Sequence, residues 1–367
     1  MSRRPWHTRA TELFGVRYPI VQTGMGWVSG AGLTAATANA GGLGILAGVT
    51  LSAEELRSTV RRVRERTDAP FGVNLRADLP DLGDRLALLS EEGVRIISFA
   101  GAPTPRTVEL VHEAGAVCVG TVGMRRHAEK IVAAGADAVI AQGGEGGGHT
   151  GPVPTTLLLP AVLDAVGDRV PVLAAGGFFD GRGMAAALSF GADGIAMGTR
   201  FLLTQESRVP DHIKRRYLDT GPTGTVVTTA VDGMSQRLIR TPVVDRLADG
   251  GPLRRILRAA TTIPRLREVT GQPLSASLRE GWSMRRHQGR SLAQVAAAAN
   301  APLLIKASLV DGDDSAGILP TGQVTGNIDD LPTVAELIDG IVGDAARALD
   351  RARRITDDPE SGGGHER

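Results

Sequence analysis

The chain has 367 residues, of which 42% are hydrophobic and 3% aromatic, and its formal net charge is +1. This length suits one large domain or two ordinary ones with a sizeable buried core. The balanced charge gives no global field that would attract nucleic acid or an anionic membrane. The single cysteine, Cys118, excludes an intramolecular disulfide and a cysteine-based zinc site, and its apolar surroundings predict a buried core thiol.

The beginning of the chain predicts a cytoplasmic protein. Arg3 and Arg4 are followed by no apolar segment, so we expect neither a secretory nor a twin-arginine export signal. No run approaches the roughly 18 apolar residues of a transmembrane helix. We therefore expect a soluble enzyme with no membrane, nucleic-acid or metal partner.

Eight short aliphatic runs, each followed by a helix-like segment, predict the fold. The runs are 20–22, 44–47, 71–75, 95–99, 116–119, 138–142, 170–175 and 194–198. They are mainly apolar throughout rather than alternating, which is typical of strands buried on both faces of a parallel sheet. Eight copies of one βα unit predict a closed (β/α)8 TIM barrel of the α/β class. An open doubly wound sheet is the structural alternative.

The helix-like segment after the second run shows how these connections are built. Ser52 and Glu55 have the spacing of a capping box at a helix start. Leu56, Val60 and Val63 follow on one face of the predicted helix. We expect this face to pack against the sheet.

The pattern changes after residue 200. We expect residues 10–230 to form the barrel and 231–330 to form a mainly helical elaboration that covers its mouth. After residue 200, we expect 205–300 to be mainly helical and polar, and 301–330 to be rich in loops. The stretch 251–300 carries nine arginines and two glutamates.

The end of the chain divides into a helix and a tail. Residues 331–355 are predicted to contain an amphipathic helix that packs back on the barrel. Its apolar stripe consists of Val334, Leu337, Ile338, Ile341 and Val342. Residues 356–367, rich in glycine and charge, are predicted to be disordered.

Glycines follow several of the predicted strands, at the end where such barrels bind ligands. Gly24 follows the first strand, Gly176 and Gly177 the seventh, and Gly198 the eighth, with Thr199 next to it. Glycine lets backbone amides approach an anion closely, and phosphate sites after strands 7 and 8 are common in this fold. One glycine pair alone would indicate only a tight turn; two such ends on adjacent strands favour a phosphate site.

The segment after the sixth run is the most informative one. Five of the six residues 143–148 are glycine, and His149 follows them. Glycine at this density costs conformational entropy, so we expect a functional reason, such as a flat ring lying on the backbone. An imidazole titrates near neutral pH and can exchange a proton there. Glu145 could orient His149 or face solvent, and both interpretations stay open.

Two uncharged amides, Asn74 and Gln142, stand at predicted strand ends. Each offers a donor and an acceptor, which suits the polar edge of an isoalloxazine ring; hydrogen bonding to neighbouring loops is the alternative. The sequence contains no Rossmann GxGxxG pattern in context, and no Walker A, HExxH or GxSxG motif.

Together these motifs resemble the nitronate monooxygenase family and its relative, the flavin-containing enoyl-ACP reductase. The resemblance covers roughly 10–230 and 322–326, and its specific motifs are Gln142–Gly151, Ala174–Gly177 and Met197–Arg200. It implies FMN in the barrel mouth and His149 as the active-site histidine. The residues that it implies for FMN are Gly24 and Met25 against the ring, Asn74 and Gln142 at its polar edge, and Gly147, Gly176, Gly177, Gly198 and Thr199 around the ribityl chain and phosphate.

Within the family the chain is most similar to an actinobacterial branch that degrades steroid C/D rings as a bicyclic hydroxy-indane carboxyl-CoA thioester. The stretches 21–27, 144–152, 177–183 and 309–312 carry this similarity. It implies oxidation or reduction of the Cα–Cβ bond of a cyclic acyl-CoA, with His149 as acid or base. Nitronate monooxygenases usually have alanine where this chain has Gly146, which disfavours a nitronate substrate.

Three alternatives remain open at this stage. The protein could oxidise alkyl nitronates with O2, reduce enoyl thioesters with NAD(P)H, or bind flavin without catalysis. The arginines of 251–300 could clamp CoA phosphates or belong to a solvated helix face. The electron partner, whether NAD(P)H or another acceptor, and a homodimeric assembly also stay open.

Overall fold

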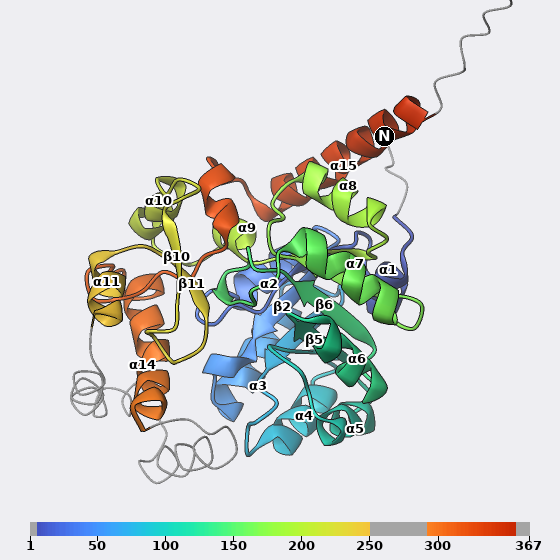
Figure 1. The fold of residues 1–367 in the computed structure, drawn as a ribbon. Helices are drawn as coiled ribbons and strands as arrows, with labels where there is room; N and C mark the ends of the chain where they lie inside the picture. Colours follow the sequence, from blue (N-terminus) through green and yellow to red (C-terminus); the bar gives the residue numbers. More distant parts are fainter. Residues whose placement is uncertain (1–5, 250–291, 357–367) are drawn as a thin grey trace, which may run out of the picture.

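The structure is a computed structural model, and it describes residues 6–249 and 292–356 of the chain. For 292–300 and for Thr356 it describes the backbone alone. Its centre is a closed barrel of eight parallel strands (Figure 1). The barrel strands, in order around the barrel, are β1 (Ile20–Gln22), β2 (Leu43–Ala47), β3 (Phe71–Leu75), β4 (Ile96–Phe99), β5 (Val117–Val122), β6 (Ala138–Gln142), β8 (Val172–Ala175) and β9 (Gly194–Met197). β9 pairs with β1, so that Val21 lies opposite Ala196. This pairing confirms the predicted TIM barrel and excludes the open sheet.

Helices surround the barrel on its outside. They are α1 (Arg9–Phe14), α2 (Ala31–Asn39), α3 (Ala53–Arg64), α4 (Leu82–Glu91), α5 (Pro105–Glu113), α6 (Arg125–Ala133), α7 (Thr155–Val166) and α8 (Gly181–Ser189), with a 3-10 turn η1 (Gly48–Thr50). α3 begins at the predicted capping box, in which Ser52 accepts a hydrogen bond from the Glu55 N–H. Leu56, Val60 and Val63 are fully buried, as their spacing predicts. Periodicity and capping therefore define this helix correctly.

The interior of the barrel is a packed core that α1 closes at one end. Inward residues such as Ile45, Ile140 and Leu173 form one cluster, to which α1 adds Ala10 and Phe14. α1 precedes β1 in the chain, so it covers the N-terminal ends of the strands. The opposite end, where the strands finish, is the end at which barrels of this fold bind their ligands. Cys118 lies in the core between strand and helix, as expected, and burial raises the pKa of its thiol to about 12.

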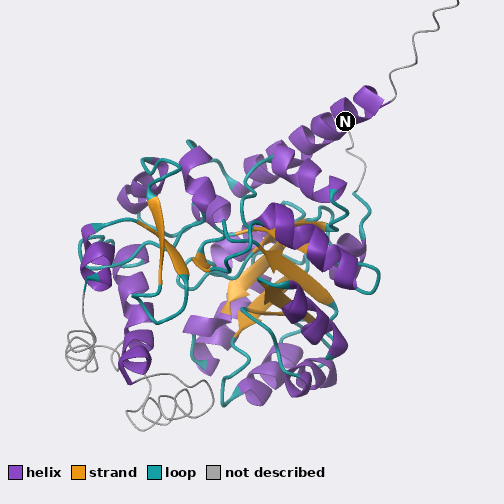
Figure 2. Cartoon of the chain, viewed as in Figure 1, coloured by secondary structure: helices purple, strands orange, loops and turns teal. Residues whose placement is uncertain are grey.

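A second group of elements lies beside the barrel (Figure 2). Its members are α9 (Thr199–Leu202), α10 (Asp211–Leu218), β10 (Thr225–Thr228), β11 (Gln236–Ile239), α11 (Pro242–Ala248), α14 (Leu292–Leu309) and η2 (Gln323–Asn327). The last helix, α15 (Val334–Thr356), packs on the helices of the barrel instead. β10 and β11 form an antiparallel hairpin, and β11 also pairs with β7 (Gly148–His149). Leu238, Val244 and Ile318 form a small core of their own beneath this hairpin. The glycine-rich loop of the barrel is thus joined to the second group through a three-stranded sheet.

One expectation for this part of the chain needs correction. Residues 205–300 were expected to be mainly helical, but 225–228 and 236–239 are strands. The residues of the first strand are all β-branched, which is typical of a strand, but the helical neighbours on both sides of the hairpin mask that signal. Residues 301–330 are rich in loops, as expected, apart from the 3-10 turn η2 and the end of α14, which extends to Leu309 because its aliphatic run packs on the small core.

α15 lies along α8 at the edge of the barrel (Figure 1). All five residues of its predicted apolar stripe are buried, which confirms the amphipathic helix. The arginines of 251–290 and the tail from 357 lie outside the described residues, and the predicted domain boundaries stay predictions. Within 6–249 and 292–356, no helix combines the length and the apolar character needed to cross a membrane.

Candidate active site

The glycine-rich loop after β6 is held by hydrogen bonds at both ends. The Gln142 side chain donates from Nε2 to the carbonyl of His149, at 2.7 Å. The carboxylate of Glu145 accepts from the backbone N–H and the hydroxyl of Thr155, at 2.9 and 2.7 Å. Thr155 is the first residue of α7, and a carboxylate is favoured at a helix N-terminus. Neither interpretation of Glu145 was right: it neither orients His149 nor faces solvent, because it caps α7.

Close packing explains several glycines of this loop. A Cβ on Gly143 would overlap Thr155, and a Cβ on Gly146 would lie 2.6 Å from Gln142 Nε2. A Cβ on Gly147 would meet the backbone of Thr321 and Gly322. These three glycines are therefore required by contacts within the protein, which corrects the expectation that their density reflects a ligand alone. Contact between Gly147 and a cofactor stays a prediction.

His149 is the last residue of the short strand β7, opposite Gln236 of β11. Its side chain is 53% exposed, whereas the side chain of Asp232 beneath it is 7% exposed. His149 Nε2 lies 2.7 Å from Asp232 Oδ2 and 3.1 Å from the amide nitrogen of Gln236. The structure thus places the predicted histidine in an accessible position above a buried carboxylate.

Two opposing effects act on the Asp232 carboxyl. Burial by itself raises its pKa, but hydrogen bonds and charge from His149, with donors from the Met234 N–H and Gln236, outweigh this effect. The net result is a pKa below the usual value for aspartate, so that Asp232 is a carboxylate at neutral pH. Sequence reasoning missed Asp232 and Gln236. The one available signal was a charged residue next to the apolar pair Ala230 and Val231.

Arg237 fastens the hairpin to the glycine-rich loop. Its guanidinium donates to the carbonyl of Gly144 and to the Thr225 hydroxyl, both at 2.9 Å. Burial lowers the pKa of Arg237, and the charge of Glu145 opposes that effect. Sequence reasoning missed Arg237, because its partner in the glycine-rich loop, Gly144, lies 93 residues away in the chain.

The end of β8 has the geometry expected of a ligand cradle. Gly176 and Gly177 have φ angles of +88° and +90°, which other residues rarely adopt. Gly177 is exposed. A Cβ added there would have one neighbour within 4 Å, the Cβ of Glu145 at 3.9 Å. The space above Gly177 is thus open at the mouth of the barrel, as a group bound over the strand end requires.

The ends of β1 and β3 lie in direct contact. A Cβ on Gly24 would overlap the Asn74 side chain, so only glycine permits this approach. The Asn74 amide donates to the carbonyl and hydroxyl of Ser98 on β4, at 3.2 and 3.3 Å. Asn74 therefore holds two strand ends together, and a contact with flavin stays a prediction.

The end of β9 meets both β1 and the segment before η2. A Cβ on Gly198 would lie 3.3 Å from the Met25 sulfur. The Thr199 hydroxyl accepts a hydrogen bond of 2.8 Å from the Gly322 N–H. The predicted residues thus contact one another around the mouth of the barrel. Gly24 packs against Asn74, Gly198 lies next to Met25, and Gln142 is hydrogen-bonded to His149. Thr199 and Gly147 both contact Gly322. Apart from Gly322, which precedes η2, these residues lie at the end of a barrel strand or in the segment that follows it.

Comparison with known proteins agrees with this arrangement. A protein-family profile described as nitronate monooxygenase matches residues 7–88 and 83–344. A Mycobacterium tuberculosis protein named (3aS,4S,5R,7aS)-5-hydroxy-7a-methyl-1-oxo-octahydro-1H-indene-4-carboxyl-CoA dehydrogenase is 54% identical over 95% of this chain and 99% of its own length. A Rhodococcus jostii protein of the same name is 52% identical over 94% and 97% of the two chains.

A solved structure is similar over almost the whole chain. FabK from Thermotoga maritima superimposes with a TM-score of 0.77 at 31% identity, and the match covers 95% of this chain and 99% of that one. The profile match, the relatives and the barrel point to the same group of oxidoreductases. The chain belongs to the nitronate monooxygenase family.

Proposed function

We propose that this protein is an FMN-dependent oxidoreductase that oxidises the Cα–Cβ bond of a cyclic acyl-CoA thioester in steroid ring degradation. The observation that carries the proposal is the accessible imidazole of His149 at the glycine-lined mouth of the barrel, hydrogen-bonded to a buried carboxylate. The relatives that are 54% and 52% identical are named for an indane carboxyl-CoA substrate. This identity, over nearly the full length of both chains, supports the same substrate class here.

The family is one of flavoenzymes, and the mouth of this barrel fits FMN. The open space above Gly177 supports a bound group there, and the Gly176–Gly177 turn, with Gly198 and Thr199 beside it, is the proposed phosphate end. The proposed ring site is the β1 end, where Gly24 and Met25 lie between Asn74 and Gly198. The remaining proposed contacts come from Gln142 and Gly147.

His149 is the proposed base of the reaction. A thioester carbonyl makes the adjacent Cα–H acidic, and a neutral imidazole can accept that proton. The bound flavin supplies the acceptor for the hydride that leaves Cβ. In the reverse direction, the imidazolium of His149 returns the proton to Cα. Because the ring of His149 is half exposed, a substrate can reach it without rearrangement of the hairpin.

Anaerobic titration tests the substrate class. The purified protein should show a flavin spectrum in visible light, and the flavin absorbance should bleach with a cyclic acyl-CoA. Bleaching with NADH or NADPH instead would identify an enoyl-thioester reductase, and O2-dependent turnover of propionate 3-nitronate a nitronate monooxygenase. A flavin that none of these compounds reduces would indicate a non-catalytic flavin protein.

Replacing His149 with alanine tests its role as the base. Positioned general bases typically contribute about 10²–10⁴-fold, so His149→Ala should slow flavin reduction by the acyl-CoA by about that factor. Stopped-flow absorbance measures the rate, and the FMN content of the variant should equal that of the wild type. A suitable control is His212→Ala, since His212 bonds the Gly312 carbonyl away from the barrel mouth. Reduction of the His149→Ala flavin at the wild-type rate would refute the role.

A further inference from the structure

We propose that Asp232 is the positioning residue of His149: it holds the imidazole in the tautomer that carries its proton on Nε2, so that Nδ1 is the atom that takes the substrate proton. The inference rests on the proposed role of His149 as the base. It is carried by the 2.7 Å contact between His149 Nε2 and Asp232 Oδ2 and by the burial of Asp232 beneath an exposed ring.

The partners of Asp232 determine which atom donates in this contact. Asp232 Oδ1 accepts a 2.9 Å hydrogen bond from the Met234 N–H, two residues along the chain. Two contacts compete for His149 Nε2: the Gln236 amide nitrogen at 3.1 Å would need a lone pair there, whereas the Asp232 carboxylate at 2.7 Å needs a proton. The bond to the charged carboxylate is the shorter and stronger of the two, and Gln236 also donates to that carboxylate. An ionised carboxylate can only accept hydrogen bonds. His149 Nε2 therefore carries the proton in the favoured arrangement, and three donors converge on one carboxylate.

The tautomer decides the chemistry of the ring. A neutral imidazole has one N–H and one lone pair, so a proton on Nε2 leaves the lone pair of His149 on Nδ1. In the reaction, the Cα–H bond of the substrate breaks and an N–H bond forms at Nδ1. The electron pair stays on the substrate, delocalised onto the thioester oxygen. It then forms the Cα=Cβ bond as the Cβ–H bond breaks, and the hydride would go to the flavin that the proposed function requires. The imidazolium so formed lies against the negative charge of Asp232, which stabilises it.

The tertiary structure builds this pair from two distant segments. Asp232 lies in the turn between β10 and β11, 83 residues from His149, and β11 aligns Gln236 with His149 across the sheet. The turn itself is fixed by the Met234 N–H bond and by burial of Val231 in the small core. The second group of elements therefore has a role in the proposed chemistry, since it supplies the partner of the catalytic ring.

Elsewhere the chain contains a second histidine–aspartate pair that serves as a matched control. His112 Nε2 lies 2.9 Å from Asp137 Oδ2, and the same oxygen accepts from the Cys118 N–H at 2.7 Å. Asp137 directly precedes β6, at the end of the barrel opposite the mouth. Loss of its charge perturbs a similar local network without reaching the proposed site.

The test uses the FMN-loaded protein and three variants. In Asp232→Asn, the amide can rotate so that its NH2 donates to Nε2, which favours the wrong tautomer of His149. Flavin reduction by the acyl-CoA should then slow by at least about tenfold, up to the 10²–10⁴-fold expected on loss of the base itself. Asp232→Glu, which restores the charge, should recover part of the rate, and Asp137→Asn should retain the wild-type rate.

A spectroscopic measurement separates positioning from a merely structural role. Nitrogen-15 NMR of histidine-labelled wild-type protein distinguishes the two tautomers of His149, whose signals are identified by their absence from His149→Ala. We expect the signature of an Nε2–H ring. An Nδ1–H ring in the wild type would overturn the proposal, and so would wild-type flavin reduction in Asp232→Asn. Because this measurement needs only the wild type and His149→Ala, an Nδ1–H ring would overturn the proposal even if Asp232→Asn does not fold. Loss of the Nε2–H signature in Asp232→Asn is the result that assigns the tautomer to the carboxylate.

The outcomes also separate this inference from the proposed function. Slow reduction in His149→Ala with normal reduction in Asp232→Asn would overturn the role of Asp232 and leave the base in place. Normal reduction in His149→Ala would overturn the function proposed for His149, whatever tautomer the NMR spectra show.

Discussion

Single residues at the mouth of the barrel divide into those that face a ligand and those that hold the others in place. His149 is half exposed, whereas Asp232 and Asn74 are buried and make hydrogen bonds inside the protein. Buried polar groups of this kind fix the geometry of a site, because an unpaired buried donor or acceptor costs about 1–3 kcal/mol. An accessible ring over a fixed carboxylate is the arrangement that proton transfer requires.

At the residue scale, Gly177 offers a test of the flavin site. A Cβ there would occupy the open space above the end of β8, so Gly177→Ala should weaken FMN binding at least tenfold. Equilibrium titration by flavin fluorescence measures the dissociation constant. The matched control is Gly115→Ala: Gly115 also has a positive φ, +68°, with open space around its Cβ, but it lies between α5 and β5.

Both glycine variants adopt a backbone conformation that alanine disfavours by about 1–2 kcal/mol, so both should lose some stability. Only the Gly177 variant should lose affinity for FMN. Equal FMN affinities in the two variants would show that the cofactor does not lie over Gly177.

At the element scale, close contacts at glycine determine how α15 sits on the barrel. Gly181, the first residue of α8, faces the backbone of α15, and a Cβ added there would overlap Ala345, Asp344 and Ile341. The α15 stripe is buried against this surface. The small residue thus allows the two helices to approach, while the apolar stripe contributes most of the hydrophobic stabilisation.

Two glycine substitutions in this helix pair should change stability in opposite directions. Gly181→Ala should destabilise the protein by about 1–3 kcal/mol, because helix backbones must move apart. Gly340→Ala, in α15 where a Cβ would meet nothing within 4 Å, should stabilise it by about 0.5–1 kcal/mol through helix propensity. Guanidinium denaturation at constant m-value measures both. Stabilisation by both substitutions would contradict the close α8–α15 contact.

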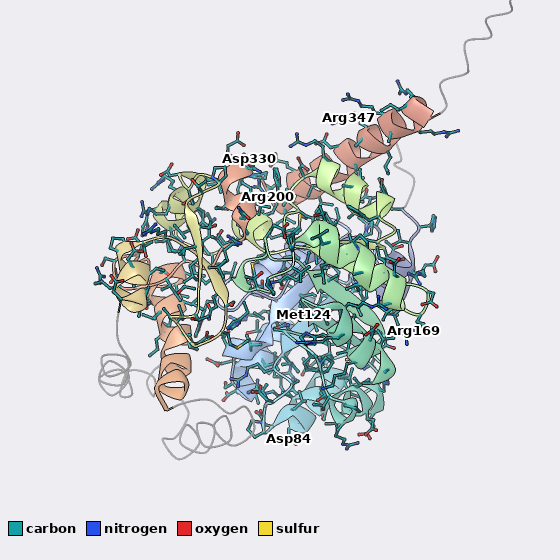
Figure 3. The ribbon with its side chains drawn as sticks, viewed as in Figure 1. Asp84, Met124, Arg169, Arg200, Asp330 and Arg347 are labelled. Atoms are coloured by element: carbon teal, nitrogen blue, oxygen red, sulfur yellow. The ribbon has the colours of Figure 1, made fainter. Side chains whose placement is uncertain are left out.

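At the scale of the whole molecule, an ion pair joins the last barrel strand to the C-terminal part. Arg200, in α9 just after β9, donates to the Asp330 carboxylate at 2.6 Å and to the Asp330 carbonyl at 3.0 Å (Figure 3). Arg200 is 4% exposed and Asp330 62% exposed. Burial lowers the pKa of Arg200, and Asp330 opposes that effect. The segment that leads to α15 is thereby fixed to the barrel.

Removing the carboxylate should weaken this junction. Asp330→Ala leaves the buried guanidinium of Arg200 with carbonyl partners only. We expect the free energy of unfolding to fall by about 1–2 kcal/mol. The loss is no larger because water already screens the exposed Asp330 carboxylate. Chemical denaturation measures the loss. In the exposed pair of Arg106 and Glu109, both side chains are 62% exposed, and Glu109→Ala should have a smaller effect. An effect at Asp330 no greater than at Glu109 would contradict the structural role of Arg200.

The sequence alone predicts most of the barrel and the location of its site. Apolar runs identify all eight barrel strands, and the glycine-rich motif identifies His149 and the strand ends around it. These features are local: an uninterrupted apolar run indicates a buried strand, and a cluster of glycines indicates an unusual loop, whatever the rest of the chain contains. The hairpin 225–239 was missed because its strands have only four residues each and show no regular alternation of buried and exposed positions, which leaves little periodicity to detect.

What the sequence by itself determined is therefore the kind of each barrel element, the identity of the fold and the residue expected to move protons. Only the tertiary structure decided that Glu145 caps α7, that Gly147 packs on the segment before η2, and that Asp232 lies beneath His149. The physical reason is the range of the interactions involved. Helix and strand patterns arise from residues a few positions apart, whereas a hydrogen bond between residues 83 positions apart exists only once the barrel and the hairpin have packed together.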